Sequence, residues 1–414
     1  MIITLTRRTV PMFIGIAFGL FFVLSCSTFK NTGINNAEES YNSGDYADAR
    51  ENIDQQIRNN PEDSEAFILK LKILNKLATG TNPVKDRAPV FREMTETAGM
   101  LKINEAEHPY TEKADSILHQ AWNKEQQAGI KLLQQDQSHV YQENFNEIVN
   151  HFRNALILKP ENETTYNLLA TTYYRHGDID KAIKTIDEAS GYITVLSNEL
   201  NSKLAYLNLE SGNIAEAIEI YQRLLDSDPD NKNYQHGLVN SYILGHHHEE
   251  SISVLEKMMK EGVDDNLYKE ALASELLFKF NEELENSLSD DTVMAGDISV
   301  SQLTDIYNRV EKLNSERNPR QEADFGSNYT IAGLYNNSAK NLFQLAGRIS
   351  SENSSKAEKL EVLGKNFLQS SLPYWEKLAN EYPDNPDIIK SLYQVYVKLE
   401  MKENAESIRS NYNF

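Results

Sequence analysis

The sequence has 414 residues, of which 62 are acidic and 41 basic, so the formal net charge is −21 at pH 7. Such a charge repels nucleic-acid phosphate and anionic lipid headgroups, and we expect no nucleic-acid partner. The chain has one cysteine, which excludes a disulfide framework. Its hydrophobic share of 40% is below the roughly 45–50% of typical globular chains, which favours thin, two-layer packing.

The chain begins with the pattern of a secretory signal. Arg7 and Arg8 precede an uncharged apolar run, Val10–Leu24, which ends next to Cys26. A charged start, a short apolar stretch and a small residue before the cut are typical of a cleaved signal peptide. The run is shorter than the roughly 20 residues that span a bilayer. An uncleaved anchor and an ordinary buried thiol remain the alternatives.

The end of this run, Val23-Leu24-Ser25-Cys26, resembles a bacterial lipobox. The resemblance implies that residues 1–25 are a lipoprotein signal peptide and that Cys26 is acylated as the first mature residue. Residues 26–36 are then a polar tether. Similarity to lipoprotein sorting makes Ser27 favour the outer membrane, so we expect a membrane-anchored lipoprotein of the bacterial cell envelope that faces the periplasm.

One short motif, or phrase, occurs three times. It consists of a glycine, a polar residue directly after it, and an alanine five positions after the glycine. Its copies begin at Gly44, Gly177 and Gly212, and the last two lie 35 residues apart. The glycine can take the left-handed conformation that ends one helix, and the next residue, such as Asp178, can cap the following helix. The alanine, such as Ala182, is predicted to lie between helices. A period of this length indicates stacked helical hairpins.

These residues resemble the tetratricopeptide repeat family, position by position. The residues that carry the resemblance in two adjacent units are Tyr166, Leu169, Ala170, Tyr173, Gly177, Ala182, Ile186 and Ala189, followed by Ala205, Gly212, Ala217, Tyr221 and Pro229. A third unit, 232–263, is degenerate, with Ser251 where the small alanine belongs. The resemblance implies an all-α solenoid of stacked helical hairpins over residues 37–262.

Longer helices are predicted outside the regular repeats. Apolar residues at helical spacing predict helices over 87–103, 110–133, 144–158, 329–349, 357–382 and 386–399. The polar runs 287–297 and 318–326 are rich in turn-forming residues and are predicted linkers. Residues 263–414 therefore form a C-terminal helical repeat region.

The sequence offers no catalytic motif, and we expect neither enzyme activity nor a cofactor or metal. The run His246-His247-His248 could supply metal ligands, but adjacent histidines on a turn diverge, and we expect a solvated turn. Asp226, Asp228 and Asp230 alternate as in a calcium loop, but Pro229 interrupts them. Trp122 and Trp375 lie at helical spacing from apolar residues and are predicted to pack in the core.

The repeat phase also predicts a groove, which in this family binds extended peptides or partner helices. Its predicted residues are Asn167, Thr171, Tyr174, Arg175, Ser202, Tyr206, His236 and Asn240. Arg175 is the only basic residue among them, which speaks against a C-terminal carboxylate ligand. The alternative is that these side chains simply face solvent.

Two functions of different class remain. The first is a lipid-anchored scaffold or adaptor that binds protein or peptide partners in the cell envelope, with an outer-membrane assembly complex as one candidate setting. The second is a helical-repeat lipoprotein for glycan or nutrient capture, or an envelope enzyme. An exposed aromatic platform would favour glycan capture, whereas a polar groove with one basic residue favours protein binding.

The lipoprotein hypothesis predicts that Cys26 fixes the location of the chain, because lipidation needs its thiol and no other cysteine can replace it. In the native host, Cys26→Ala should abolish labelling by radioactive palmitate, whereas Ser25→Ala, which keeps a small residue before the cut, should still be labelled. Labelling that persists in Cys26→Ala would disprove the hypothesis.

Overall fold

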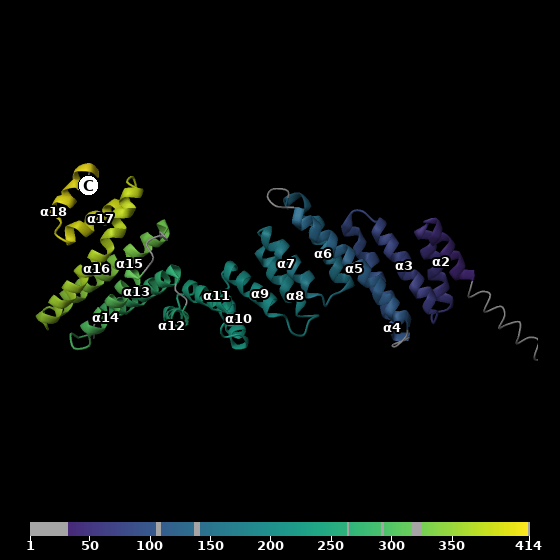
Figure 1. The fold of residues 1–414 in the computed structure, drawn as a ribbon, viewed down its shortest axis with the longest axis horizontal. Coiled ribbons are helices and arrows are strands. Elements are labelled where there is room, and N and C mark those ends of the chain that lie inside the picture. Colours follow the sequence, from purple (N-terminus) through teal and green to yellow (C-terminus); the bar gives the residue numbers. More distant parts are fainter. Residues whose placement is uncertain are drawn as a thin grey trace, which may run out of the picture. The chain divides into compact units, whose positions relative to one another are not determined.

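The computed structural model describes residues 32–104, 109–135, 141–262, 265–290, 294–316 and 324–412 (Figure 1). These residues form helices joined by turns, and no strand occurs among them. The predicted all-α solenoid is therefore confirmed. Cys26 and the predicted signal peptide lie outside the described residues.

The chain divides into two compact units, residues 1–211 and 212–414. The division falls in the turn that begins at Gly212, one of the three repeated glycines, whose φ is 85°. The division at Gly212 separates two groups of residues that contact one another closely. The boundary predicted between residues 262 and 263 instead marks a change from regular to longer repeats, and it stays a prediction.

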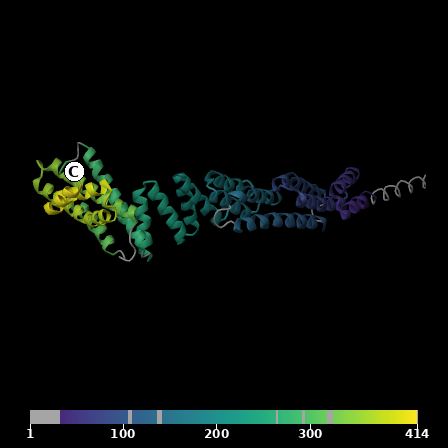
Figure 2. The ribbon, with the colours of Figure 1, turned by 90° about the horizontal axis from the view of Figure 1, so that it is seen from above.

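The first unit is a series of helices in which neighbours along the chain pack together. Residues 32–43 are helical and are followed by α2 (Tyr46–Asn59), α3 (Ser64–Gly80), a short 3-10 turn (Val84–Arg87), α4 (Ala88–Asn104), α5 (Pro109–Gln135), α6 (Tyr141–Leu158), α7 (Glu163–Arg175), α8 (Ile179–Ala189) and α9 (Asn198–Ser211). Helices α5 and α6 lie side by side in both views (Figures 1 and 2).

The start of the first unit corrects the predicted tether. Residues 32–36 belong to the predicted polar tether, yet they begin the first helix. Ile34 packs against a cluster that includes the buried residues Ala37 and Ile53, and burial of this apolar side chain favours the helix over an extended tether. Residues 26–31 lie outside the described residues.

The packing predicted for the repeat around Gly177 is confirmed. Ala182 is 0% exposed, and Leu169 and Ile186 are fully buried beside it in one apolar cluster. Gly177 has a φ of 85°, the left-handed conformation that a residue with a Cβ adopts at a cost. The turn and the small residue therefore act as the sequence predicts.

The predicted cap of α8 is wrong. The side chain of Asp178 accepts no backbone N–H; it accepts instead from Nζ of Lys181 at 3.0 Å. Asp45, in the first copy of the phrase, does cap its helix and accepts the N–H of Asp48 at 3.1 Å. A nearby lysine competes for the carboxylate in one copy and is absent from the same position in the other, where Asp48 stands.

The second unit begins with regular hairpins and continues into longer helices. Its elements are α10 (Ile214–Ser227), α11 (Lys232–Leu244), α12 (His248–Lys260), α13 (Asn266–Ser289), α14 (Val300–Ser315), α15 (Phe325–Ile349), α16 (Ser354–Glu381), α17 (Pro386–Lys398) and α18 (Lys402–Tyr412). Helix α15 packs against both α13 and α16. The linkers predicted at 287–297 and 318–326 overlap the end of α13 and the start of α15.

An aromatic cluster forms the centre of the second unit. Phe280, Tyr335 and Phe367, from α13, α15 and α16, are almost fully buried, and the rings of Phe280 and Phe367 lie 5.1 Å apart. The hydroxyl of Tyr335 donates to Oε1 of Glu311 at 2.6 Å and accepts from Nδ2 of Asn314 at 2.7 Å. Burial, together with Glu311, raises the pKa of Tyr335 above its usual value. The three long helices therefore share one apolar core. The ring of Tyr335 is buried in this core, and its hydroxyl is hydrogen-bonded to Glu311 and Asn314.

The packing of the repeats predicts the cost of a charge at Ala217, which is 0% exposed on α10. Ala217→Glu should bury an unpaired carboxylate and lower the free energy of unfolding by on the order of 3 kcal/mol. Ala215→Glu, on the exposed side of the same helix, is the matched control and should change it little. Equal denaturation midpoints for the two variants would contradict this packing.

Candidate functional site

Polar side chains of α7 face polar side chains of α9, and that of Ser197 just before α9, in matched pairs within the first unit. We call this set the polar ladder; its pairs are Glu163 with Ser197, Asn167 with Glu199, Thr171 with Lys203, and Tyr174 with Tyr206. The members of the last three pairs are 32 residues apart. The ladder follows from the repeat, because equivalent positions of successive first helices lie next to each other when the hairpins stack.

Lys203 lies at the middle of the polar ladder. Its Nζ donates to Oγ1 of Thr171 at 2.5 Å and to Oδ1 of Asn167. Thr171 donates its own proton to the backbone oxygen of Asn167 at 2.7 Å, so its lone pair is free to accept from the lysine. Burial, with Arg175 as a further positive charge, lowers the pKa of Lys203, although Glu199 opposes this effect. The two oxygens that hold the ammonium group are neutral.

Two tyrosines form the last pair of the polar ladder. The hydroxyls of Tyr174 and Tyr206 lie 2.7 Å apart, and their rings meet edge to face with centroids 5.7 Å apart. This hydrogen bond, followed by burial, raises the pKa of Tyr206 above its usual value. Tyr206 is still 40% exposed, so its ring is fixed and remains available at the surface.

The structure distributes the eight predicted groove residues between the two units. Four of them, Asn167, Thr171, Tyr174 and Tyr206, belong to the polar ladder. Arg175 is exposed at the end of α7, and Ser202 is half-buried on α9. His236 and Asn240 lie on α11 of the second unit, where Nδ1 of His236 is 2.8 Å from the hydroxyl of Tyr268. That these residues bind a partner stays a prediction.

Sequence reasoning missed Lys203, and with it a second cation near Arg175. The prediction places Ser202 and Tyr206, which are four residues apart, on the exposed face of α9. Lys203 is three residues before Tyr206, and residues three apart also share a helix face. Its separation of 32 residues from Thr171 was a further signal, since it matches the separation of Tyr174 from Tyr206.

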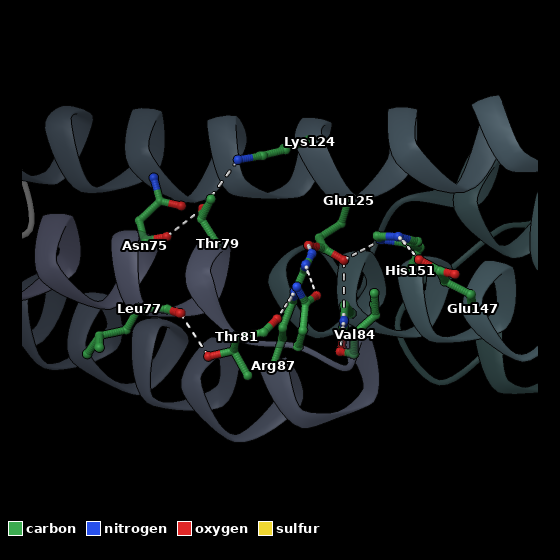
Figure 3. Close-up of polar contacts among 12 residues, drawn as sticks. Asn75, Leu77, Thr79, Thr81, Val84, Arg87, Lys124, Glu125, Glu147 and His151 are labelled. Carbon is green, nitrogen blue, oxygen red and sulfur yellow. Dashed lines mark hydrogen bonds and ion pairs between the residues drawn. The ribbon is translucent and has the colours of Figure 1, made fainter. Parts of the chain in front are cut away.

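A second polar cluster is buried inside the first unit (Figure 3). Glu125 of α5 is only 3% exposed, and it accepts from Nη1 of Arg87 at 2.8 Å and from Nδ1 of His151 at 2.7 Å. Nδ2 of Asn154 bonds both Glu125 and the backbone oxygen of Val84, at 3.3 and 3.1 Å. Burial alone would raise the pKa of Glu125, but His151 and Arg87 outweigh it and hold the pKa below its usual value. The cluster ties the 3-10 turn to α5 and α6.

The histidine run in the second unit is only partly the solvated turn that the sequence predicts. His246 and His247 are exposed, and His246 has a φ of 57°. His248 instead stacks on Phe278 and donates from Nδ1 to Oε2 of the buried Glu275 at 2.9 Å. His248 is the first residue of α12 and faces α13, so its ring packs against α13 and is not part of the solvated turn.

This second-unit cluster does not have the geometry of a catalytic triad. Oγ of Ser251 donates to Oε2 of Glu275 at 2.6 Å and not to the imidazole of His248, so the histidine cannot take its proton. Among the described residues, no three histidine, cysteine or acidic side chains come together as a metal site needs. No helix in the described ranges is long and apolar enough to cross a membrane.

Comparison with known sequences identifies the repeats. Two models described as "Tetratricopeptide repeat" match residues 167–232 and 208–275. The tetratricopeptide repeat-containing protein trd-1 of Caenorhabditis elegans is 33% identical over 84 residues, which are 20% of this chain. The match covers 11% of the length of that protein.

Solved structures of repeat proteins are also similar to the chain. A tetratricopeptide repeat protein of Parabacteroides merdae matches 88% of this chain and 98% of its own, with 13% identity and a TM-score of 0.30. PilF of Pseudomonas aeruginosa matches 69% of this chain and 98% of its own, with 11% identity and a TM-score of 0.35.

The buried Glu125 cluster predicts a pH-dependent contribution to stability. Since the pKa of Glu125 is lower in the folded chain, its contribution is present above its unfolded pKa and is lost as the pH falls through its folded pKa. Glu125→Gln should therefore lower the free energy of unfolding by about 3 kcal/mol at neutral pH, because Arg87 loses its charged partner.

The difference between Glu125→Gln and the parent should shrink at acidic pH, as the pH falls through the lowered pKa of Glu125 and the carboxyl group of the folded parent becomes protonated. Urea denaturation at both pH values measures it. Glu147→Gln, on an exposed carboxylate 3.9 Å from Nε2 of His151, is the control and should have a small effect. A pH-independent loss in Glu125→Gln would contradict the assignment.

Proposed function

This chain is a tetratricopeptide-repeat protein, and we propose that it is a lipid-anchored scaffold of the bacterial cell envelope that holds partner proteins. Tetratricopeptide repeats suggest an interaction scaffold, because stacked hairpins expose a long continuous surface. A non-catalytic role is typical of such a fold. An outer-membrane assembly complex is the setting that we propose, with the chain facing the periplasm.

The polar ladder is the observation that best supports binding of a protein partner. It presents the exposed ring of Tyr206 and the ammonium group of Lys203, and its hydrogen bonds hold these two side chains in place before a partner arrives. Arg175, the residue after Tyr174, adds a positive charge that acts on Lys203. Tyrosine and arginine are the residue types that commonly dominate binding energy at interfaces. Side chains that are already ordered lose less entropy on binding. The ladder is thus suited to recognition of a polar or acidic surface.

The proposed location depends on Cys26. An acyl chain contributes about 0.8 kcal/mol for each buried methylene, so several chains on one cysteine would hold the protein on a bilayer. The net charge of −21 would keep the rest of the chain away from anionic headgroups. Anchoring through lipid and recognition through repeats are therefore compatible tasks for separate parts of the chain.

The proposal predicts that the polar ladder together with the adjacent Arg175, and not the histidine turn, carries recognition. Arg175→Ala combined with Tyr206→Ala should weaken partner capture by about tenfold or more, which corresponds to roughly 1.4 kcal/mol. Both side chains are exposed, so the melting temperature should change little. Capture is measured by crosslinking the tagged lipoprotein in its host and quantifying the co-purified proteins.

His246→Ala combined with His247→Ala is the matched control, because both side chains are exposed and lie far from any ladder position in the sequence. It should capture partners as the parent does. A control variant that loses its partners while the ladder variant keeps them would refute the proposed role of the ladder.

A further inference from the structure

A groove of about 740 Å³ lies between α15 and α17 in the second unit. Its floor includes the buried residues Leu368 and Trp375 of α16, and its walls carry Tyr329 of α15 and Gln394 of α17. The volume is within the roughly 300–1,000 Å³ of ligand-binding clefts. The groove lies outside residues 167–275, which the repeat models match. The chemistry of its lining indicates what it can hold.

An exposed aromatic platform, formed by Phe325, Tyr329 and Tyr382, adjoins the groove through Tyr329. The three side chains are 39%, 38% and 42% exposed. The ring centroids of Tyr329 and Phe325 lie 5.7 Å apart, and Tyr329 also packs edge to face on the buried Trp375 at 5.5 Å. The ring of Tyr382 meets that of Phe325 at 4.7 Å. These contacts hold the rings in place while part of each stays at the surface, and such a platform is the feature that favours a glycan.

Helix α15 leaves room for a sugar ring beside this platform. Gly333 lies one turn after Tyr329 and lines the groove, and the Cβ that it lacks would have open space around it. One face of a pyranose ring presents C–H groups, which pack well on the negative face of an aromatic ring. A sugar can therefore stack on Tyr329 and lie against the backbone at Gly333.

The exposed polar residues of the lining suit sugar hydroxyls. Asn337 and Gln344 of α15 and Gln394 of α17 are all exposed. Each of their carboxamides both donates and accepts hydrogen bonds, as a hydroxyl group does. Because these carboxamides come from both walls of the groove, hydroxyl groups on either edge of a sugar ring have partners.

The charge of the groove is opposite to that of the chain. Its lining contains Lys340 and Lys398, and none of the described residues that form it is acidic. Both lysines are exposed, and neither pairs with a carboxylate of the described residues. Asp324 and Glu381 adjoin the aromatic platform in sequence but lie outside the lining. In a protein with 62 acidic residues, two unpaired ammonium groups in one groove favour an anionic ligand.

We propose that the groove between α15 and α17 binds an acidic oligosaccharide, a glycan whose sugars carry carboxylates. A sugar ring stacks on Tyr329, hydroxyl groups pair with the exposed carboxamides, and carboxylates lie near Lys340 and Lys398. This ligand goes beyond the proposed scaffold function and is independent of it, because the polar ladder belongs to the first unit. A neutral glycan would leave both lysines without a role, and an acidic peptide would leave the aromatic platform without one.

The test uses the full chain and an immobilised panel of galacturonate, glucuronate and mannuronate oligosaccharides, each beside its methyl ester. The ester keeps the sugar ring and removes the charge. At least one uronate should bind, its ester should bind about tenfold more weakly, and added salt should weaken binding of the uronate. Lys340→Ala combined with Lys398→Ala should remove the difference between uronate and ester. Lys390→Ala, at an exposed lysine of α17 outside the groove, should leave the difference unchanged.

A second pair of variants tests the stacking surface. Gly333→Leu should fill the space beside Tyr329 and reduce uronate binding by about tenfold or more. Its melting temperature should hold or rise, because leucine favours a helix more than glycine does. Gly347→Leu makes the same change on α15 outside the groove, also in open space, and should leave binding unchanged. Loss of binding without loss of stability distinguishes a ligand site from a packing role.

Several results would overturn the inference and leave the scaffold function standing. They are the absence of binding to any uronate, equal binding of uronate and ester, and equal losses in Gly333→Leu and Gly347→Leu. Lysine-dependent binding of a polyglutamate peptide, with no uronate bound, would make the groove a protein site instead. If crosslinking in the host shows that the parent captures no protein while the uronate still binds, the scaffold function fails and the glycan site stands.

Discussion

The structure depends on the close approach of helices that cannot bury their apolar faces alone. Ala182 and Ala217 are 0% exposed at helix contacts, and a larger side chain at either position would separate the helices. Each hairpin therefore completes its core against a neighbour, as repeat proteins do. Because hairpins of similar length stack on one another, equivalent positions of successive first helices lie next to each other. Surface side chains at these positions therefore meet at a constant spacing along the chain. Thr171 meets Lys203 and Tyr174 meets Tyr206 at the same spacing of 32 residues. The same spacing joins His236 to Tyr268 within the second unit. The polar ladder thus follows from core packing, because the buried alanines fix the distance between the helices that carry it.

Much of the fold could be predicted because its signals are local. The left-handed glycine at Gly177 and the buried Ala182 are found where the repeated phrase puts them. The predicted long helices also correspond to described ones, as 329–349 does to α15. What the sequence could not predict depends on competition between alternative partners or on contacts with residues distant in the sequence. Asp178 binds Lys181 and leaves the helix cap unmade, and nothing in the phrase decides between these two partners. The helix at residues 32–36 needed knowledge of the apolar cluster on which Ile34 packs.

The candidate site shows the same division between local and distant information. Repeat phase placed Asn167, Thr171, Tyr174 and Tyr206 on one face, but it missed Lys203, whose role becomes visible only when α7 and α9 are paired. The surroundings of Trp375 were beyond sequence reasoning for a different reason. Nε1 of Trp375 has no hydrogen-bond partner among the described residues, and this state depends on side chains from α15, α16 and α17 at once. The sequence correctly predicted that Trp375 is a packing residue, since it is 2% exposed. A tryptophan can fill the core with its ring and still leave its N–H for another partner, because the two ends of the side chain have different chemistry.

The degenerate third repeat shows how a departure from a family pattern can be compensated. Ser251 stands where the pattern has alanine, and a hydroxyl buried there would cost free energy if it had no partner. It donates to Glu275, a buried carboxylate of α13, and the same carboxylate accepts from His248. A buried glutamate and a half-buried histidine would be unfavourable alone, whereas Oγ of Ser251 also lies 2.9 Å from the backbone oxygen of His248. Together they satisfy one another, and α12 keeps the regular length and position of a repeat helix. The unit departs from the repeat pattern at Ser251, and a linked polar set compensates for the departure. Glu275→Leu would leave the ring of His248 without this partner and Ser251 with only the backbone oxygen of His248, so it should cost more than the removal of the whole set.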